Sequence, residues 1–434
     1  MNQLRFLGTL FGTLLATAAA VPAGAQSRPD TGALLLLRAA RVWDGVADAP
    51  QSGIVVLVRG NRIEAVGSAA QVGVPRGARV IDLPNTTLLP GLIDLHSHVL
   101  LHPYNETSWD DQVLRESLGE RVARATNHLR NTLMAGFTTL RDLGTEGAAD
   151  TDAGLRHAIE IGVIPGPRLF VANRAIVMRG TYGPKGFAPE VSVPQGAEEA
   201  GGIEELTRVT RDQIRRGADW IKIYADYRWG PRGETRPAFT TEEIARVVEI
   251  AKESGRPVVA HASSVEGMTR AIMGGVTTIE HGDDGTPEVF RLMAQKGVYF
   301  CPTIAAGDAI QRYRGWKPGV GADPAGIAAK RASVKAAIDA GVVFANGSDV
   351  GVFTHGDNAR EIELLVEYGL TPVQAMRSAT SVAGKVLGYD GTLGVVKVGA
   401  LADLIAVTGD PTKNVAATRA VVAVIKDGAV VKVP

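Results

Sequence analysis

The sequence predicts an α/β protein in which a (β/α)8 TIM barrel over residues 89–390 is joined to a small β-sandwich domain formed by both chain ends. In the middle of the chain, short apolar runs alternate with longer helical patterns, which is typical of parallel βαβ units. Eight such units over roughly 300 residues favour a barrel. The expected barrel strands are Leu88–Leu95, Phe137–Leu140, Arg168–Ala172, Trp220–Tyr224, Pro257–Ala260, Val276–Glu280, Val298–Cys301 and Val342–Ala345.

The two chain ends, residues 26–88 and 391–434, carry a different pattern. Runs such as Gly53–Val58 and Ala402–Val407 are short, apolar and bounded by turn-forming residues. This pattern is typical of strands. Because both ends share it, we expect them to pair into one composite β-sandwich domain.

Residues 1–25 have the features of a secretory signal peptide. A long apolar stretch follows Arg5, and Ala23–Ala25 forms a small-x-small cleavage site. We therefore expect a mature chain that begins at Gln26 and is periplasmic or secreted. A retained membrane anchor is the alternative. No later apolar run is long enough to span a bilayer, so no membrane association is expected after cleavage.

Composition narrows the function. Lysine plus arginine and aspartate plus glutamate both number 46, so the chain lacks the basic excess of a general nucleic-acid binder. A single cysteine excludes an intrachain disulfide framework and a cysteine-based zinc cluster. Any metal site must therefore use histidine, carboxylate or a modified lysine.

Barrel enzymes carry their catalytic groups at the carboxyl ends of the strands. The first predicted strand ends in His96-Ser97-His98, and alternate residues of a strand share one face, so His96 and His98 can bind one ion together. Lys222 lies inside the apolar fourth strand, where a buried ammonium is costly. Reaction with carbon dioxide would convert Lys222 into an anionic carbamate able to bridge two cations; a lysine extending to the barrel rim is the alternative.

Three further candidates end other strands. His261 follows the fifth strand, His281 the sixth and Asp349 the eighth. Singly, each histidine could be a core residue, and Asp349 could be a helix N-cap. Together with His96, His98 and Lys222 they come from five strands at one barrel end. This set predicts two divalent metal ions, preferably Zn²⁺, which together generate a hydroxide nucleophile at neutral pH.

The segment Pro90–His98, with Lys222, His261, His281 and Ser348-Asp349, closely resembles the amidohydrolase superfamily. The resemblance implies that His96, His98 and Asp349 bind the more buried metal, and that His261 and His281 bind the more exposed one. It also implies that carboxylated Lys222 bridges the two metals. Asp349 would take the proton of the bridging hydroxide and pass it to the leaving amine.

Within the superfamily, three segments are similar to the imidazolonepropionase-related branch, namely Leu101–Glu106, Asp219–Asp226 and Gly347–Asn358. Members of this branch include Xaa-Pro dipeptidases, N-acyl amino acid carboxypeptidases and ochratoxin-hydrolysing amidohydrolases. The resemblance implies cleavage of an amide bond in a small-molecule amide or dipeptide, with release of a C-terminal amino acid.

The leaving amino acid keeps an α-carboxylate, for which arginine is the usual bidentate partner. Tyr224 shares a strand face with Lys222, and the resemblance suggests that it contacts substrate. Arg228 is a candidate carboxylate ligand, and His355 could shape the pocket or bind substrate. Solvated or structural roles are the alternatives for both. Further candidates for the carboxylate or for aromatic walls are Arg179, Lys185, Trp109, Trp229 and Trp316.

Two other functions use the same scaffold. A cyclic-amide or lactone hydrolase, or a deaminase, would keep the fold, although Lys222 argues against a deaminase because deaminases of the superfamily commonly use one metal. A non-enzymatic binding protein on a decayed barrel would have lost metal ligands, whereas all six are present here. Relatives often form even-numbered assemblies, so a homo-oligomer is possible.

Overall fold

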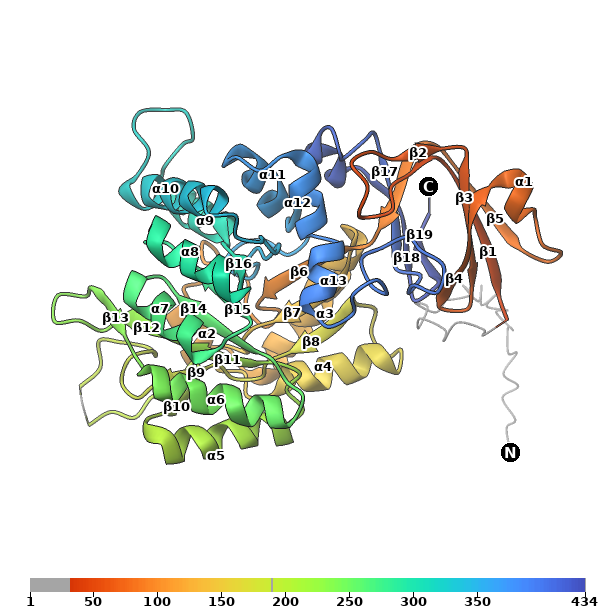
Figure 1. Cartoon of the computed structure of the whole chain (residues 1–434). Coiled ribbons are helices and arrows are strands. Elements are labelled where there is room, and N and C mark those ends of the chain that lie inside the picture. The colour runs from red at the N-terminus through yellow and green to blue at the C-terminus, as the bar shows by residue number, and fades with distance from the viewer. Residues whose placement is uncertain (1–31, 189, 434) are drawn as a thin grey trace, which may run out of the picture.

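The computed structural model describes residues 32–188 and 190–433 (Figure 1). Residues 1–25, the predicted signal peptide, lie outside this part, so that prediction and the predicted location stand as predictions. No helix in the described residues combines the length and apolarity that a membrane span requires. The chain has the mixed α/β content that its sequence predicts.

Strands from both chain ends share one eight-stranded sheet, in the order β19-β18-β17-β5-β1-β3-β4 with β2 paired to β1. The ends meet where β17 lies antiparallel to β5, from Leu404 opposite Pro90 to Thr408 opposite Thr86. The strands are β1 (Leu34–Val42), β2 (Gln51–Ser52), β3 (Ile54–Arg59), β4 (Arg62–Ser68), β5 (Arg79–Pro90), β17 (Leu404–Thr408), β18 (Val421–Lys426) and β19 (Ala429–Lys432).

This arrangement differs from the two-sheet sandwich that the sequence predicts. Both β1 and β5 pair along both edges, so the strands stay in one continuous sheet. The alternation along β17 explains its apolar sequence. Leu404 and Ala406 pack with residues of the terminal sheet, whereas Ile405 and Val407 join the core of the central strands and helices. The predicted domain boundaries remain predictions.

The central strands are parallel and belong to two further sheets. A three-stranded sheet holds β6 (Leu92–Ser97), β7 (Phe137–Asp142) and β8 (Arg168–Val171). A six-stranded sheet has the order β10-β9-β11-β14-β15-β16. Its members are β9 (Ile176–Met178), β10 (Glu198–Ala200), β11 (Ile221–Tyr224), β14 (Val258–Ala262), β15 (Thr278–His281) and β16 (Tyr299–Cys301).

The strands therefore do not form the single closed barrel that the sequence predicts. The eighth predicted strand, Val342–Ala345, makes only one bridge, between Phe344 and Phe300. Separate hydrogen bonds still connect this segment to its neighbours: the Ala345 amide donates to Phe300 O at 2.8 Å, and the Leu95 amide donates to Asn346 O at 2.9 Å. Farther along, Asp349 adopts a left-handed backbone with φ of +60°, so a regular strand cannot continue through that position.

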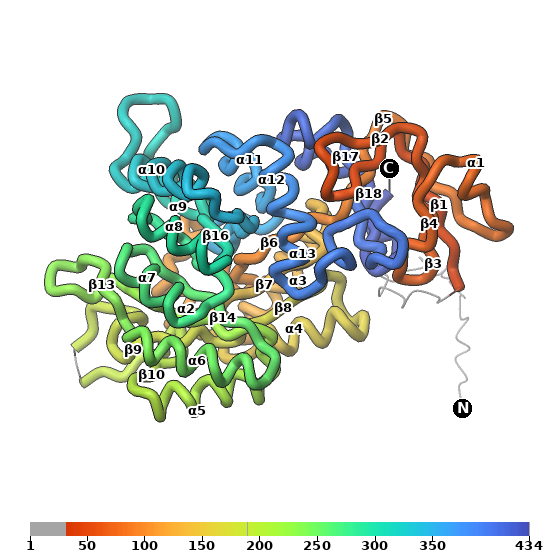
Figure 2. The backbone as a smooth tube through the Cα atoms, viewed as in Figure 1, coloured from red at the N-terminus to blue at the C-terminus, as the bar shows by residue number. Residues whose placement is uncertain are grey.

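The helices lie around these strands, with the terminal sheet to one side (Figure 2). Successive helices α5 to α8 pack side by side. Side-chain hydrogen bonds cap the first turns of several helices; for example, Thr240 and Glu243 form a capping box at α6. The helices are α1 (Ala69–Val72), α2 (Trp109–Arg115), α3 (Leu118–Met134), α4 (Thr151–Glu160), α5 (Gly202–Arg215), α6 (Thr241–Glu253), α7 (Val265–Gly274), α8 (Pro287–Lys296), α9 (Ile304–Tyr313), α10 (Ala325–Asp339), α11 (Ala359–Glu367), α12 (Pro372–Ser378) and α13 (Ser381–Val386), with a 3-10 turn η1 (Val415–Arg419) and a hairpin of β12 (Asp226–Arg228) and β13 (Thr235–Pro237).

Candidate metal centre and active-site cavity

His96, His98 and Asp349 converge at the carboxyl end of β6. The Nε2 atoms of His96 and His98 lie 3.6 Å and 3.3 Å from Oδ1 of Asp349. Backbone hydrogen bonds hold the two segments together, since the Asp349 amide donates to His96 O at 2.7 Å and the His98 amide donates to Val350 O at 2.8 Å. All three residues are buried, and one donor atom from each lies within 4.8 Å of the others. These three atoms can therefore bind a single ion.

The far sides of both imidazoles are occupied by oxygen atoms. His96 Nδ1 lies 2.7 Å from Oε2 of Glu280, and His98 Nδ1 lies 2.8 Å from Gly144 O. Nδ1–H donation to these oxygens leaves each Nε2 lone pair directed at Asp349, which is how proteins orient histidine ligands. Although burial opposes it, the charges of Asp349 and Glu146 raise the pKa of His98 to about 9. The surroundings thus favour a positive charge here, whether a proton or a metal ion.

Glu280 is a supporting residue that the sequence reasoning missed. It is fully buried and pairs with Arg141, whose Nη2 lies 3.0 Å from Glu280 Oε1. Despite burial, Arg141 and His96 hold the pKa of Glu280 well below its usual range, so the carboxylate stays charged. Its signal was in the sequence: an acid within an apolar strand, next to His281 and on the face of Thr278.

His261 and His281 form a second pair on β14 and β15. Their ring centroids are 4.4 Å apart, and His281 lies 5.2 Å from His96, so the imidazoles of both pairs adjoin. His281 Nδ1 is 2.8 Å from Oγ1 of Thr303, which leaves its Nε2 available. His281 and Thr303 both have left-handed backbones, with φ of +74° and +50°. Such strained residues concentrate at functional sites.

Lys222 lies on β11, and its charge acts on histidines of both pairs. It is only 1% exposed, and its Nζ has no hydrogen-bond partner among the described residues. Burial lowers the pKa of Lys222, which favours the neutral amine that can react with carbon dioxide. After burial, the charge of Lys222 is the main factor lowering the pKa of His96 to about 4 and of His261 to about 3. An unpartnered amine among histidine and carboxylate donors fits two divalent cations joined by a carbamate.

Asp94 fixes the position of Asp349 from behind. It accepts hydrogen bonds from the Ser348 amide at 2.9 Å and from Asn358 Nδ2 at 2.7 Å, and thereby fastens the loop after the eighth strand segment to β6. Burial raises the pKa of Asp94 to about 6, against the hydrogen bonds that favour its charged form. Asp94, His96 and His98 alternate along one strand, so the same spacing supplies two ligands and their support.

A cavity of about 580 Å³ opens over these groups. Tyr224 and Arg228 line it as predicted, and Tyr224 stacks on His261 with centroids 4.4 Å apart. His355 is not among the lining residues; it is buried, stacks on His128 and contacts Leu101 O through Nε2 at 2.9 Å. The prediction treated His355 as a substrate contact, whereas the loop turns its ring into the protein interior.

The additional candidates also differ in whether they line the cavity. Trp109 lines the cavity. Arg179 pairs with Glu205, and Lys185 lies over the ring of Tyr227. The Trp229 indole is largely exposed, and Trp316 packs against Arg312. Lining residues that the sequence reasoning missed include Glu146, Arg314, Lys330 and Thr303.

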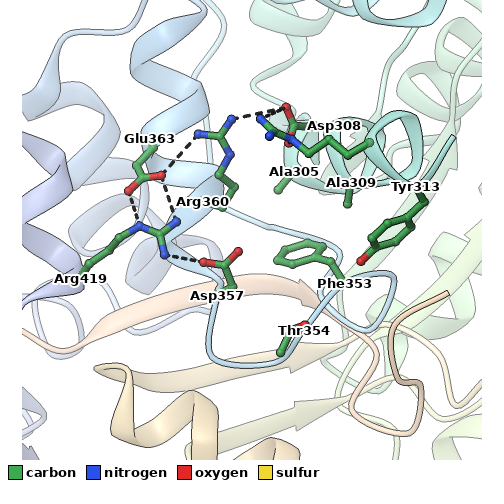
Figure 3. A pocket seen from close by; sticks show the side chains of 11 residues that line it. Ala305, Asp308, Ala309, Tyr313, Phe353, Thr354, Asp357, Arg360, Glu363 and Arg419 are labelled. Atoms are coloured by element: carbon green, nitrogen blue, oxygen red, sulfur yellow. Dashed lines mark hydrogen bonds and ion pairs between the residues drawn. The ribbon is translucent and has the colours of Figure 1, made fainter. Parts of the chain in front are cut away.

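A second cavity, of about 390 Å³, also borders α9 (Figure 3). Its charged side chains are paired with one another: Arg419 with Asp357 and Glu363, and Arg360 with Asp308. Within this cavity every charged group of the described lining has an ion-pair partner. The four histidines and the aspartate of the candidate metal centre line the larger cavity instead: His96, His98, His261, His281 and Asp349.

Comparison with known proteins identifies the family to which the chain belongs. The sequence model of the Amidohydrolase family matches residues 87–433. The chain belongs to the amidohydrolase family. It is 30% identical over 357 residues to an ochratoxinase of Aspergillus niger. The alignment covers 76% of this chain and 71% of the ochratoxinase. An imidazolonepropionase of Sphingopyxis alaskensis is 25% identical, and that alignment covers 82% of this chain and 86% of the imidazolonepropionase.

The fold agrees with that assignment. A crystal structure of a Xaa-Pro dipeptidase with bound methionine is similar with a TM-score of 0.82 and 33% identity, over 92% of this chain and all of that one. These findings confirm the predicted superfamily and branch. The chain is a hydrolytic enzyme that acts on amide bonds of small-molecule substrates.

Proposed function

We propose that this enzyme uses two divalent metal ions, preferably Zn²⁺, to cleave a dipeptide or N-acyl amino acid and release its C-terminal amino acid. The observation that carries the proposal is the meeting of His96, His98 and Asp349 with His261 and His281 around the unpartnered amine of Lys222. We also infer that the two parallel sheets and the Val342–Ala345 segment together make the family's (β/α)8 barrel.

The donor set assigns each residue a place. His96, His98 and Asp349 would hold the more buried ion, His261 and His281 the more exposed one, and the carbamate of Lys222 would join them. When bound, such ions polarise a carbonyl oxygen and make water nucleophilic at neutral pH. Imidazole and carboxylate ligands suit Zn²⁺, and also bind Mn²⁺ or Co²⁺.

Asp349 is positioned to move a proton. Although burial opposes ionisation, His96 and His98 hold its pKa below the usual value, so the carboxylate is charged and can accept a proton at Oδ. The same atom faces the cavity, where it can return that proton to the leaving nitrogen as the amide bond breaks.

The leaving carboxylate has two candidate partners. The guanidinium groups of Arg228 and Arg314 both line the cavity, and neither forms a hydrogen bond or ion pair within the described part of the chain. Free arginine donors suit a carboxylate. The known relatives support such a substrate, since one is a Xaa-Pro dipeptidase and another an ochratoxinase. The signal peptide predicted at residues 1–25 favours a periplasmic or secreted enzyme.

The test is hydrolysis of a substrate panel by the mature protein, with mass-spectrometric detection of products. The panel contains Xaa-Pro dipeptides, N-acyl derivatives of aromatic and aliphatic amino acids, and ochratoxin A. Metal-dependent release of a free amino acid is expected, with loss of activity on chelation. If two metals bind and no amide of the panel is cut, ester, lactone or cyclic-amide hydrolysis replaces this proposal.

A further inference from the structure

One wall of the active-site cavity is built from four aromatic side chains around a carboxylate. The aromatic box consists of Trp109, Tyr182, Tyr224 and Tyr227, all of which line the cavity together with Glu146. Tyr182 lies at its centre: its ring centroid is 5.0 Å from that of Trp109 and 5.1 Å from those of Tyr224 and Tyr227. A ring face that lines the cavity can attract an organic cation.

Glu146 presents one carboxylate oxygen with free acceptor capacity. Its Oε2 accepts hydrogen bonds from Trp109 Nε1 at 2.9 Å and from the Tyr182 hydroxyl. Its Oε1 accepts no hydrogen bond in the described part of the chain; the nearby Nδ1 of His98, 3.7 Å away, is already bonded to Gly144 O. A carboxylate that is 2% exposed is costly unless it meets a positive charge.

The neighbouring cations leave Glu146 available. Arg121 approaches from the protein interior, but its three donor nitrogens bind the backbone oxygens of Leu100, Thr145 and Glu146 itself. On the open side, Lys185 Nζ lies 5.6 Å from the Tyr227 centroid. This exposed lysine therefore places its ammonium group within cation–π distance of one ring of the box. Glu146 also has a left-handed backbone, with φ of +50°, a strain that is typical of functional positions.

We propose that Glu146 and the aromatic box bind the free α-ammonium group of the substrate's acyl residue. The inference rests on the proposed function and narrows it, because it selects dipeptides with an unblocked N-terminus over N-acyl amino acids. The position of Glu146 in the cavity favours the α-ammonium over a side-chain cation. The α-ammonium is attached to the carbon next to the scissile carbonyl, and Glu146 lines the same cavity as His98, with its Oε1 3.7 Å from the Nδ1 atom of that ring. The cationic end of a long side chain would lie several bonds farther away.

The other acids of the cavity are less suited to this role. Asp283 is paired with Lys330 and accepts from Ser263 Oγ at 2.9 Å. Asp284 is exposed at the rim, where water screens its charge. Glu146 alone combines burial, a free oxygen and aromatic neighbours among the described lining residues. Asp284→Asn therefore serves as the matched control for Glu146→Gln.

The experiment compares two substrates that differ only in the ammonium group, L-alanyl-L-proline and propionyl-L-proline. We expect the wild-type enzyme to prefer the alanyl substrate in kcat/KM by about ten- to a hundredfold, the range of a hydrogen bond between charged groups. Glu146→Gln should remove most of this preference, and Asp284→Asn should keep it. If Glu146→Gln lowers kcat/KM for both substrates by the same factor, Glu146 only supports His98 and the inference is wrong.

A binding measurement tests this inference independently of the proposed function. Calorimetric titration with L-alaninamide and propionamide measures ammonium recognition without hydrolysis. Tighter binding of alaninamide that is lost in Glu146→Gln supports the subsite even if no amide in the panel is cut, whereas equal binding of the two amides overturns it. A third pair, propionyl-lysine and propionyl-norleucine, tests the other source: if Glu146→Gln affects only propionyl-lysine, the cation belongs to the leaving residue and the α-ammonium assignment fails.

Discussion

The two histidine pairs of the metal centre are supported in different ways. The inner pair, His96 and His98, lies at the carboxyl end of β6. His96 is backed by the charged Glu280, and the Nε2 atoms of both rings face Asp349. The outer pair, His261 and His281, comes from two strands. Its neighbours are the Thr303 hydroxyl, the stacked ring of Tyr224 and the carboxylate of Asp226, whose Oδ1 lies 3.7 Å from His261 Nε2. The inner rings are nearly inaccessible, whereas 17% of the His261 side chain is exposed.

This difference indicates how each half of the site functions. Buried negative charges at the inner pair favour tight retention of a cation, because low solvent access leaves those charges little screened. At the outer pair, the Asp226 carboxylate is already bonded to the Ser263 and Ser264 amides, and the partial exposure of His261 suits a position that substrate must reach. We therefore expect the outer ion to exchange more readily than the inner one, and the following predictions test that asymmetry.

Lys222→Ala should have the largest effect because Lys222 adjoins both pairs. We expect loss of at least one ion per chain and a fall in turnover of more than about a hundredfold, since even residues that merely orient ligands cost up to that factor. Elemental analysis and turnover measurements check this. The exposed Lys335, paired with Asp339 on α10, gives the control Lys335→Ala. Full metal content with unchanged turnover would falsify the bridging role.

Glu280→Gln should weaken the inner pair selectively. The change keeps the side-chain shape but leaves the buried charge of Arg141 unpaired, so we expect a loss of roughly 3 kcal/mol in the free energy of unfolding. Inner-site metal affinity should fall by about ten- to a hundredfold. Metal titration and thermal unfolding measure the two effects, with the exposed Glu288→Gln as control. Unchanged metal affinity would show that Glu280 supports only the fold.

Glu361→Gln should change the pH dependence of the structure that supports the outer pair. Glu361 is buried and accepts hydrogen bonds from the Ile304 and Ala305 amides at the start of α9, directly after Thr303. Burial raises the pKa of Glu361 to about 8. The native state therefore keeps a proton that the unfolded chain has lost, and this residue's contribution to stability falls as pH rises from about 4.5 to about 8.

The effect is up to a few kcal/mol, because one pKa unit corresponds to about 1.4 kcal/mol. Glutamine cannot ionise, so any loss of stability caused by the substitution should shrink between pH 5 and pH 8 on the scale of that linkage. Thermal unfolding of the metal-free wild type and variant across this range measures it. A difference independent of pH would mean that Glu361 has the same proton occupancy in the folded and unfolded states.

Thr303→Val should produce the smallest effect, limited to the outer pair. The substitution keeps the β-branched shape and removes one neutral hydrogen bond to His281. Such a bond contributes about 1 kcal/mol, so outer-site metal affinity should fall roughly fivefold while the inner site is unaffected. Thr303→Ser keeps the hydroxyl and serves as control. An equal loss at both sites would remove the distinction between the pairs.

The sequence alone determined much of this protein's chemistry. Strand alternation predicted that His96 and His98 act together, and the strand-end positions of Lys222, His261, His281 and Asp349 pointed to one site, because parallel strands end at the same edge. The β pattern of both chain ends predicted that they pair with each other; the structure shows this pairing between β5 and β17, in one sheet and not in the predicted sandwich.

Only the tertiary structure decided which groups support and extend that site. Glu280 reaches His96 across 184 residues of sequence, and Glu146 meets Tyr182 and Trp109 through loops that no local pattern aligns. His355 lies in a motif that resembled an active-site loop, yet packing turned its ring inward against His128. Periodicity fixes which face of a strand a residue occupies, but the direction of a loop side chain depends on contacts that form only when the chain has folded.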